Sequence, residues 1–314
     1  METLNIIIPE RMTGNRMDVA LSEMLPNYSR SKITAWIKSG DALIDKKTFK
    51  PKDKVNGPQL VRLSLNKKQN NDWSAENIPL NVVFEDEDII VINKACGLVT
   101  HPGAGNWSGT LANALLHYDP HLSTLDRAGI VHRLDKNTSG LMVIARNDKS
   151  QKFLVEQLQS HSVAREYSAI VYGHMIAGGM IDEPIGRDSR DRVKQAVSSS
   201  GKDAITHYRV IDRYKSHTHV KAILETGRTH QIRVHLSHIG YPLVGDPMYG
   251  GRVRFPKKAS ENLKEALLGF KRQALHSKKL TLNHPSTGEL LSWKVPLPDD
   301  MLELLTVLNE FDPC

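Results

Sequence analysis

The sequence predicts an α+β protein of two domains, and three observations support this prediction. A chain of 314 residues is longer than a single small core usually organises. Short β-branched runs alternate with segments of helical spacing over residues 77–314. Positive charge is concentrated in residues 1–70, where nine Lys and four Arg face seven Asp and Glu, so that +6 of the net +7 lies there.

The composition excludes several classes of protein. With 39% hydrophobic and 25% charged residues, the chain is typical of a globular protein rather than a disordered one. No apolar run approaches the roughly 20 residues that cross a bilayer, and the N-terminus, METLNIIIPERMTG, lacks the long apolar run of a signal peptide. Cys96 and Cys314 are too few for a disulfide framework or a cysteine zinc site, so we expect a cytoplasmic protein without a membrane partner.

Residues 1–66 are predicted to form the first domain. Apolar residues at helical spacing predict a helix from Met17 to Leu25 and a second helix around Ile33 to Ile37, which Gly40 ends. Short strands are expected at 42–44 and 61–65. This order of elements resembles the S4 RNA-binding domain. The resemblance implies phosphate contacts on one basic face, at Arg30, Lys32, Lys38, Lys46 and Lys47.

The polar residues 67–76 are the expected linker to a second domain, residues 77–314. Within that domain the apolar patterns predict strands and helices in turn. The expected strands are 82–84, 89–92, 129–131, 141–144, 165–173 and 220–224, with others near Leu280 and Trp293. The expected helices are 111–117, one around 153–158, 263–268, and a last helix after Pro298. Residues 186–203 are predicted to be an exposed loop in which Arg187, Arg190, Arg192 and Lys194 contact a phosphate backbone.

A charged cluster between two apolar runs is the centre of this second domain. The runs 129–131 and 141–144 flank the nine residues HRLDKNTSG, which begin at His132. Burying such a cluster unpaired costs several kcal/mol, so we expect a loop beside a cleft. Positive charge from Arg and Lys favours the ionised form of Asp135, which suits a nucleophile or base better than an acid. Residue chemistry alone leaves a polar surface turn as an equal alternative.

The string HRLDKNTSGL resembles the active-site signature of the RluA-type pseudouridine synthases, whose pattern is closer to HRLDKDTTGL, so Asn137 and Ser139 depart from it. The segments GLVTHPGAG, REYSAIVYG, GRTHQIRVHL and PLVGDPMYGG match the same family. The resemblance implies a catalytic domain with a mixed, largely antiparallel sheet and a central cleft. It also implies isomerisation of uridine to pseudouridine in RNA, with no cofactor and no metal, by a monomer. The segments HPGAG, HYDP, GHMIAGG and RQALH are most similar to members that act on large-subunit ribosomal RNA.

The resemblance also implies residue roles. Asp135 is the expected catalytic residue, Arg233 is expected to form a salt bridge with it, and Tyr167 is expected to pack against the target base. Arg133 matches the arginine that helps to displace the target nucleotide from its stem. The substrate-binding residues are therefore expected to be Arg133 with its neighbours His132 and Lys136.

Other functions fit the sequence less well. The glycines after residue 96 do not fit the GxGxxG dinucleotide loop, because the third glycine would be at position 108, which is Ser. His230, His235 and His238 lack both a suitable spacing and a nearby carboxylate, so no metal site is expected. A glycoside hydrolase needs two carboxylates, and we expect no second one in these motifs. A non-catalytic S4-type ribosome-assembly factor and a related synthase acting on tRNA remain the alternatives.

Overall fold

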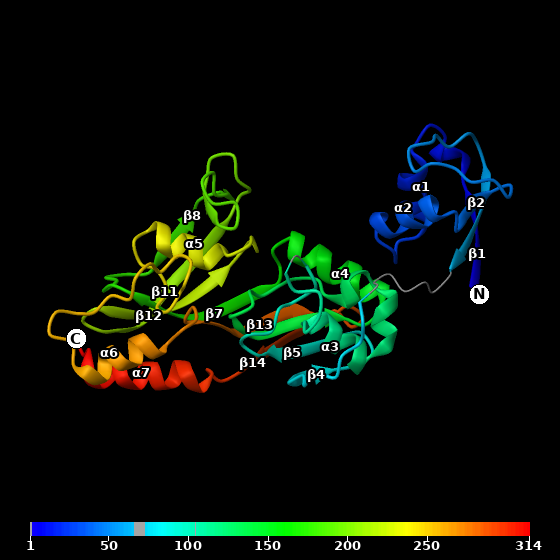
Figure 1. Cartoon of the computed structure of the whole chain (residues 1–314). Coiled ribbons are helices and arrows are strands. Elements are labelled where there is room, and N and C mark those ends of the chain that lie inside the picture. The colour runs from blue at the N-terminus through cyan, green and yellow to red at the C-terminus, as the bar shows by residue number, and fades with distance from the viewer. Residues whose placement is uncertain (1, 66–72, 104) are drawn as a thin grey trace.

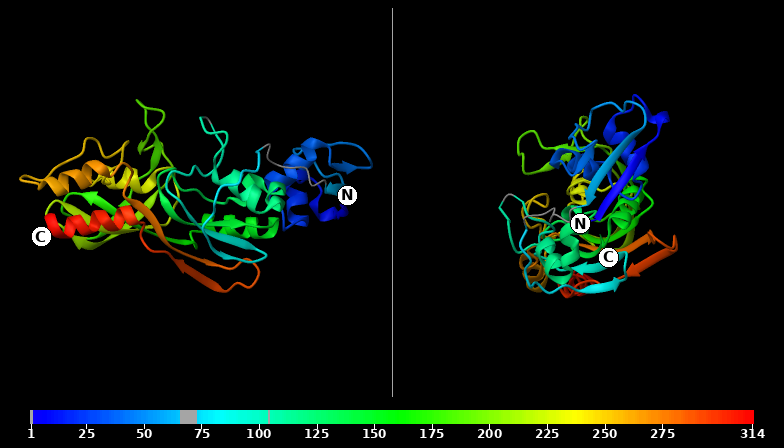
Figure 2. Two further views of the ribbon diagram at one scale, coloured as in Figure 1. Left: turned by 60° about the horizontal axis from the view of Figure 1, so that its bottom comes forward. Right: turned by 90° about the vertical axis from the view of Figure 1, so that its right-hand side faces the viewer.

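The computed structural model describes residues 2–65, 73–103 and 105–314, which form an elongated α+β molecule (Figure 1). Most of the expected linker, residues 67–72, lies outside the described residues. Figure 2 shows the N-terminal elements at one end of the long axis and the C-terminus at the other. These N-terminal elements are β1 (Glu2–Ile8), η1 (Glu10–Met12), α1 (Met17–Met24), α2 (Arg30–Ser39), β2 (Ala42–Ile44) and β3 (Gln59–Leu65).

The N-terminal residues have a hydrophobic cluster of their own. The two predicted helices are present, and the Ser29 hydroxyl caps α2 by accepting from the Lys32 amide at 3.2 Å. The strands form an antiparallel sheet in the order β1-β3-β2. Strand β1 was not predicted, because its partner β3 is distant in sequence and its apolar run is short. Its side chains alternate, with Ile6 and Ile8 buried and Ile7 exposed to solvent.

The remaining chain builds one nine-stranded sheet in the order β4-β5-β6-β13-β7-β12-β11-β8, with β14 added to β13. All pairings are antiparallel except that of β13 with β6, which confirms the mixed, largely antiparallel sheet. The strands are β4 (Val82–Glu85), β5 (Ile89–Lys94), β6 (Ser139–Ala145), β7 (Ala164–Tyr172), β8 (Gly179–Asp182), β11 (Ile205–Arg213), β12 (His217–Leu224), β13 (Leu275–Asn283) and β14 (Leu290–Lys294).

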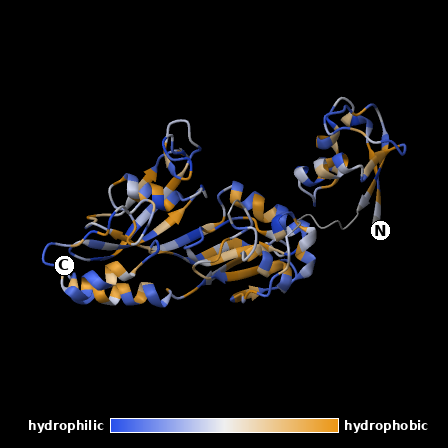
Figure 3. Cartoon of the chain, in the orientation of Figure 1, coloured by the Kyte–Doolittle hydropathy of each residue, from blue (hydrophilic) through white to orange (hydrophobic). Residues whose placement is uncertain are grey.

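Helices cover this sheet and close its apolar core. The helices are α3 (Leu111–Tyr118), α4 (Asp148–Gln159), α5 (Gln231–His238), α6 (Glu261–Gly269) and α7 (Asp299–Phe311), with η2 (Pro120–Thr124) and η3 (Asp126–Gly129). The largest hydrophobic cluster joins α3 and α5 to the inner faces of β6, β7 and β12, while α6 and α7 pack with one another in a second cluster. Figure 3 shows the apolar strands of the centre. No helix of the described ranges is long and apolar enough to span a membrane.

The predicted strand 129–131 is wrong. Residues up to Gly129 form η3, and Ile130 makes only an isolated bridge to Ile144 of β6. Arg127 and Ala128 adopt left-handed φ angles of 53° and 52°, which no strand contains. The segment also touches β6 at close range, since a Cβ on Gly129 would lie 2.0 Å from the Ala145 carbonyl oxygen.

The predicted loop 186–203 is partly structured. Strands β9 (Ile185–Arg187) and β10 (Gln195–Val197) pair as a two-stranded antiparallel hairpin, which projects above α5 in Figure 1. The segment had too little apolar alternation to predict strands. Its pairing is instead held from outside, where the Tyr249 hydroxyl accepts from the Gln195 amide at 2.9 Å.

Lysine side chains connect the N-terminal helices to the larger sheet domain. The Lys32 Nζ lies 2.5 Å from the Asp148 Oδ1 at the start of α4 and 3.2 Å from the Thr124 carbonyl oxygen. Lys152 reaches back to the Pro26 carbonyl oxygen. The Lys32 side chain is only 10% exposed and lies over the Trp36 ring.

We predict that Gly140→Ala destabilises the protein more than Gly288→Ala does. Both glycines have positive φ, so both variants carry a conformational cost of about 1–2 kcal/mol. Only at residue 140 would the new Cβ also meet backbone, 2.3 Å from the Ser277 carbonyl oxygen, where β6 pairs with β13. Chemical denaturation should therefore give a further loss of about 1–3 kcal/mol in unfolding free energy for Gly140→Ala. Equal losses for both variants would contradict this account.

Candidate active site

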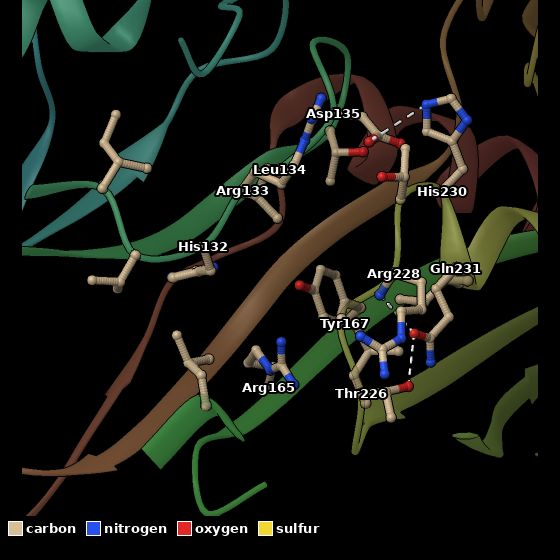
Figure 4. Close-up of a pocket in the computed structure, with 18 of the residues that line it drawn as sticks. His132, Arg133, Leu134, Asp135, Arg165, Tyr167, Thr226, Arg228, His230 and Gln231 are labelled. Carbon is tan, nitrogen blue, oxygen red and sulfur yellow. Dashed lines mark hydrogen bonds and ion pairs between the residues drawn. The ribbon is translucent and has the colours of Figure 1, made fainter. Parts of the chain in front are cut away.

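A pocket of about 630 Å³ opens where β7, the end of β12, α5 and the loop before β6 meet (Figure 4). Its apolar wall contains Leu134, Tyr167 and Leu275. Its polar wall contains four of the predicted catalytic and substrate-binding residues, which are His132, Arg133, Asp135 and Arg233. Asp135 is the only carboxylate among the lining residues, which also include Arg127, Arg133, Arg165, Arg228 and Arg233. The pocket therefore has a positive wall and one negative group.

The loop that contains Asp135 is fixed through its backbone. The Thr138 amide donates to the Asp135 carbonyl oxygen at 3.0 Å, which closes a tight turn. On the N-terminal side of this turn, the buried Thr100 hydroxyl donates to the Leu134 carbonyl oxygen at 2.7 Å. The carboxylate consequently projects from a rigid turn rather than from a mobile loop.

The buried Lys94 holds the other side of the same turn. Its ammonium donates to the carbonyl oxygens of Ala95, Leu98 and Lys136 at 2.8, 2.9 and 3.1 Å. Burial lowers the pKa of Lys94 to about 8, because the charged amine has left water. At neutral pH it remains mainly protonated. Two of its hydrogen bonds stay in the segment after β5, and the third, to the Lys136 carbonyl oxygen, joins this segment to the Asp135 loop.

Arg233 lies between two carboxylates, and one of them is the predicted partner. Its Nη1 donates to the Asp135 Oδ2 at 2.9 Å, which confirms the ion pair that the family resemblance implied. Its Nε and Nη2 donate to the two oxygens of Asp246 at 2.7 and 2.9 Å, a bidentate pair. Helix α5 places Arg233 in this position, and the face of its guanidinium lies 4.9 Å from the Tyr249 ring centre.

Burial and charge oppose each other in this pair. Burial alone would lower the pKa of Arg233, but Asp246 and Asp135 together raise it. Burial would likewise raise the pKa of Asp246, but the hydrogen bonds and charge of Arg233 hold it below its usual range. Both groups are therefore charged at neutral pH, and Asp135 faces a permanent cation.

Tyr167 and Arg165 form the wall below Asp135. They lie two residues apart on β7, so their side chains point to the same face of the sheet. In Figure 4 Tyr167 lies between Asp135 and Arg165. Burial raises the pKa of Tyr167, so its hydroxyl remains protonated at neutral pH.

His230 also contacts this site. It precedes α5 with a left-handed φ of 57°, an uncommon conformation for a residue with a side chain. Its Nε2 lies 3.7 Å from the Asp135 Oδ1, and its Nδ1 lies 2.9 Å from the Tyr249 hydroxyl. Burial lowers the pKa of His230, so the ring is neutral at physiological pH. His235 is held instead by Thr206 and the Glu183 carbonyl, away from the pocket.

The three predicted substrate-binding residues have different surroundings. Arg133 and Lys136 are exposed beside Asp135. The His132 Nε2, in contrast, accepts from the Val143 amide of β6 at 3.1 Å, and burial lowers its pKa to about 3. His132 is therefore neutral and anchors the loop to the sheet.

The predicted RNA contacts of the N-terminal region are also divided. Lys38, Lys46 and Lys47 are exposed. Arg30 pairs with the buried Asp18 at 2.8 Å, and Lys32 is engaged by Asp148 as described above. On the β9–β10 hairpin, Arg187, Arg190 and Arg192 are exposed, whereas Lys194 pairs with Asp191 at 3.6 Å.

The expectation that the motifs contain no second carboxylate is wrong, since Asp246 lies in PLVGDPMYGG. Its side chain has no exposed surface, so it cannot take the second carboxylate role of a glycoside hydrolase. The sequence of its segment gave no sign that its carboxylate pairs with Arg233. Within the described ranges, no three His, Cys, Asp or Glu side chains are grouped to hold a metal ion.

Comparison with known proteins defines the class. Residues 88–238 match the family model described as RNA pseudouridylate synthase, and this range contains Asp135, Tyr167 and Arg233. The chain is also 51% identical over 307 residues to the ribosomal large subunit pseudouridine synthase D of Escherichia coli, covering 98% of this chain and 94% of that protein. The chain belongs to the RNA pseudouridylate synthase family and is an isomerase that forms pseudouridine.

Further relatives and solved structures agree. The proteins of the same name from Pseudomonas aeruginosa and Xanthomonas campestris are 51% and 49% identical, over 96% and 97% of this chain and 95% and 92% of their own. The solved human RNA pseudouridylate synthase domain containing 4 is 28% identical with a TM-score of 0.58, covering 73% of this chain and 93% of its own. The human domain containing 1, at 23% identity and a TM-score of 0.54, covers 76% and 99% and shares the fold.

We predict that Asp246→Asn lowers the unfolding free energy of the protein, and that the loss is largest at neutral pH. Leaving Arg233 with one partner fewer costs about 3–5 kcal/mol in comparable buried pairs. Because the folded-state pKa of Asp246 is depressed, its contribution is complete above the unfolded value of about 3.9 and is lost as pH falls through the folded value. Urea titrations of both proteins at several pH values should show the difference in unfolding free energy shrinking below about pH 4. A difference that grows in acid would contradict the assignment.

Proposed function

We propose that this enzyme isomerises specific uridines of large-subunit ribosomal RNA, with Asp135 as the catalytic residue. The ion pair of Asp135 with Arg233 inside a positively charged pocket carries this proposal. The names of its relatives, ribosomal large subunit pseudouridine synthase D, support the choice of substrate. A non-catalytic assembly factor would have no use for a carboxylate fixed in such a pocket.

The reaction requires three changes at the target nucleotide. The N1–C1′ bond breaks, the uracil turns, and a C5–C1′ bond forms, with the proton from C5 ending on N1. An ionised Asp135 either attacks C1′ or removes a sugar proton, and the hydrogen bond from Arg233 holds the carboxylate in position. Tyr167 offers an aromatic face for the displaced base, and the exposed Arg133 is placed to support the strand that the base leaves. His132 and Lys136 are the remaining substrate-binding residues of this loop. His132 anchors the loop to the sheet.

We further propose three parts for the chain: an S4-like RNA-binding domain at 1–66, a linker at 67–76 and a catalytic domain at 77–314. The separate hydrophobic cluster of the N-terminal residues supports this division. The exposed Lys38, Lys46 and Lys47, together with Arg187, Arg190 and Arg192 of the hairpin, then contact RNA phosphates. Ribosomal RNA as substrate also places the protein in the cytoplasm, and we propose that it acts as a monomer.

The substrate is tested by mapping pseudouridines in total RNA from cells with and without this protein. Loss of specific pseudouridines from large-subunit ribosomal RNA, restored by wild type and not by Asp135→Asn, is the expected result. Loss from tRNA alone would identify the related tRNA synthase instead. An unchanged pseudouridine map would contradict the proposed substrate.

Asp135→Asn should reduce single-turnover pseudouridine formation by about 10³-fold or more, because it removes a group that acts on the reacting atoms. Stability should change little, since Arg233 keeps its bidentate partner Asp246. Tritium release from labelled RNA measures the rate, and thermal unfolding provides the control. Activity within tenfold of wild type would exclude Asp135 from the chemistry.

Replacing Lys38, Lys46 and Lys47 together by Ala should weaken binding to ribosomal RNA and flatten its salt dependence. Each lost phosphate contact lowers the slope of log affinity against log salt by about 0.7–0.9. The matched control replaces three exposed lysines at the far end of the molecule, Lys257, Lys258 and Lys271. Equal slopes for the two triple variants would mean that the N-terminal face does not contact RNA.

A further inference from the structure

We propose that Arg165 binds a phosphate of the RNA strand beside the target uridine. This inference rests on the proposed function and names a residue that binds the substrate. Arg165 lines the pocket on the same face of β7 as Tyr167, yet only 5% of it is exposed to solvent. A nucleotide bound in this pocket would therefore lie close to the guanidinium.

The charge of Arg165 has no counterion within the described part of the chain. Among the residues that the structure describes, one hydrogen bond engages it, from its Nη2 to the Glu225 carbonyl oxygen at 3.1 Å. Its Nε is buried and has no hydrogen-bond partner among these same residues. Burial accordingly lowers the pKa of Arg165, and no carboxylate is close enough to oppose this effect. A buried cation in this state is costly unless an anion binds to it.

The surroundings of Arg165 indicate that this anion comes from the ligand. Five arginines line the pocket, and its single carboxylate, Asp135, is already paired with Arg233. A concave surface with this charge attracts anions, and the planar guanidinium fork matches the geometry of a phosphate. Uracil is neutral when it enters and would leave the charge uncompensated. A phosphodiester is therefore the better partner than the base.

Gly227 provides a second, independent observation. A Cβ at this position would lie 2.7 Å from the Arg165 Nη1, and Gly227 also lines the pocket. The backbone of Gly227 does not adopt a positive φ, so conformation does not require glycine here. Its missing side chain instead gives the Arg165 guanidinium room at the wall of the pocket, and a side chain at residue 227 would displace Nη1.

The test compares wild type, Arg165→Met, Arg165→Lys and Gly227→Ala in single-turnover assays on large-subunit ribosomal RNA over a range of salt. Loss of a charged hydrogen bond should raise the half-saturating enzyme concentration of Arg165→Met about 10- to 100-fold. Its log–log salt slope should fall by about 0.7–0.9, as for one lost phosphate contact. Arg165→Lys should keep the slope and recover part of the affinity. Gly227→Ala should weaken binding in the same direction.

Thermal unfolding separates this role from a structural one. Arg165→Met should unfold at the same temperature as wild type or higher, because it removes an uncompensated buried charge. The control is Arg146→Met, which takes away the partner of the nearly buried Asp119 and should lower the midpoint. A lower midpoint for Arg165→Met, or an unchanged salt slope, would overturn the proposal. Failure of wild type to modify this RNA would instead overturn the proposed function.

Discussion

The shared ion pair of Arg233 is the interaction on which the site depends. One guanidinium binds Asp135 with one nitrogen and Asp246 with two, so a single side chain joins the loop before β6, helix α5 and the turn after it. The fully buried Asp246 fixes the guanidinium, and the partly exposed Asp135 receives its remaining donor. Asp246 therefore has a structural role, whereas Asp135 remains accessible to a substrate.

The sheet explains why the Asp135 loop can be so rigid. Its one parallel pairing, β13 with β6, brings His276 opposite Ser139, and their side chains lie 2.9 Å apart. The loop emerges from the start of β6, at the point where Gly140 passes too close to Ser277 to carry a side chain. Lys94 at the end of β5 adds a hydrogen bond to the Lys136 carbonyl oxygen of this loop. Catalytic geometry of this kind is expected on regular elements rather than on free loops.

Local sequence patterns predicted most of this fold but only part of the site. Helices α1, α2, α3 and α7 follow from apolar spacing and from residues that end a helix, such as Pro26 and Gly40. Strand β1 and the β9–β10 hairpin depend on distant partners, so their own residues predict little. Asp135, Tyr167 and Arg233 were found through family motifs. The sequence did not predict a role at this site for Asp246, His230 or Arg165. Their contacts form only in the folded protein, and the spacing of residues in the sequence does not reveal them.

The net charge of the chain is a poorer guide to RNA binding than the contacts that each cation makes. Two cations of the basic N-terminal region are already engaged, since Arg30 binds Asp18 and Lys32 binds Asp148 of the larger domain. These ion pairs join elements of the protein to one another. The pocket shows the opposite case, because Arg165 is buried with its charge uncompensated. The partners of each cation therefore indicate more than the composition does where positive charge is available, and Arg165, two residues before Tyr167, is the one that we propose binds a phosphate.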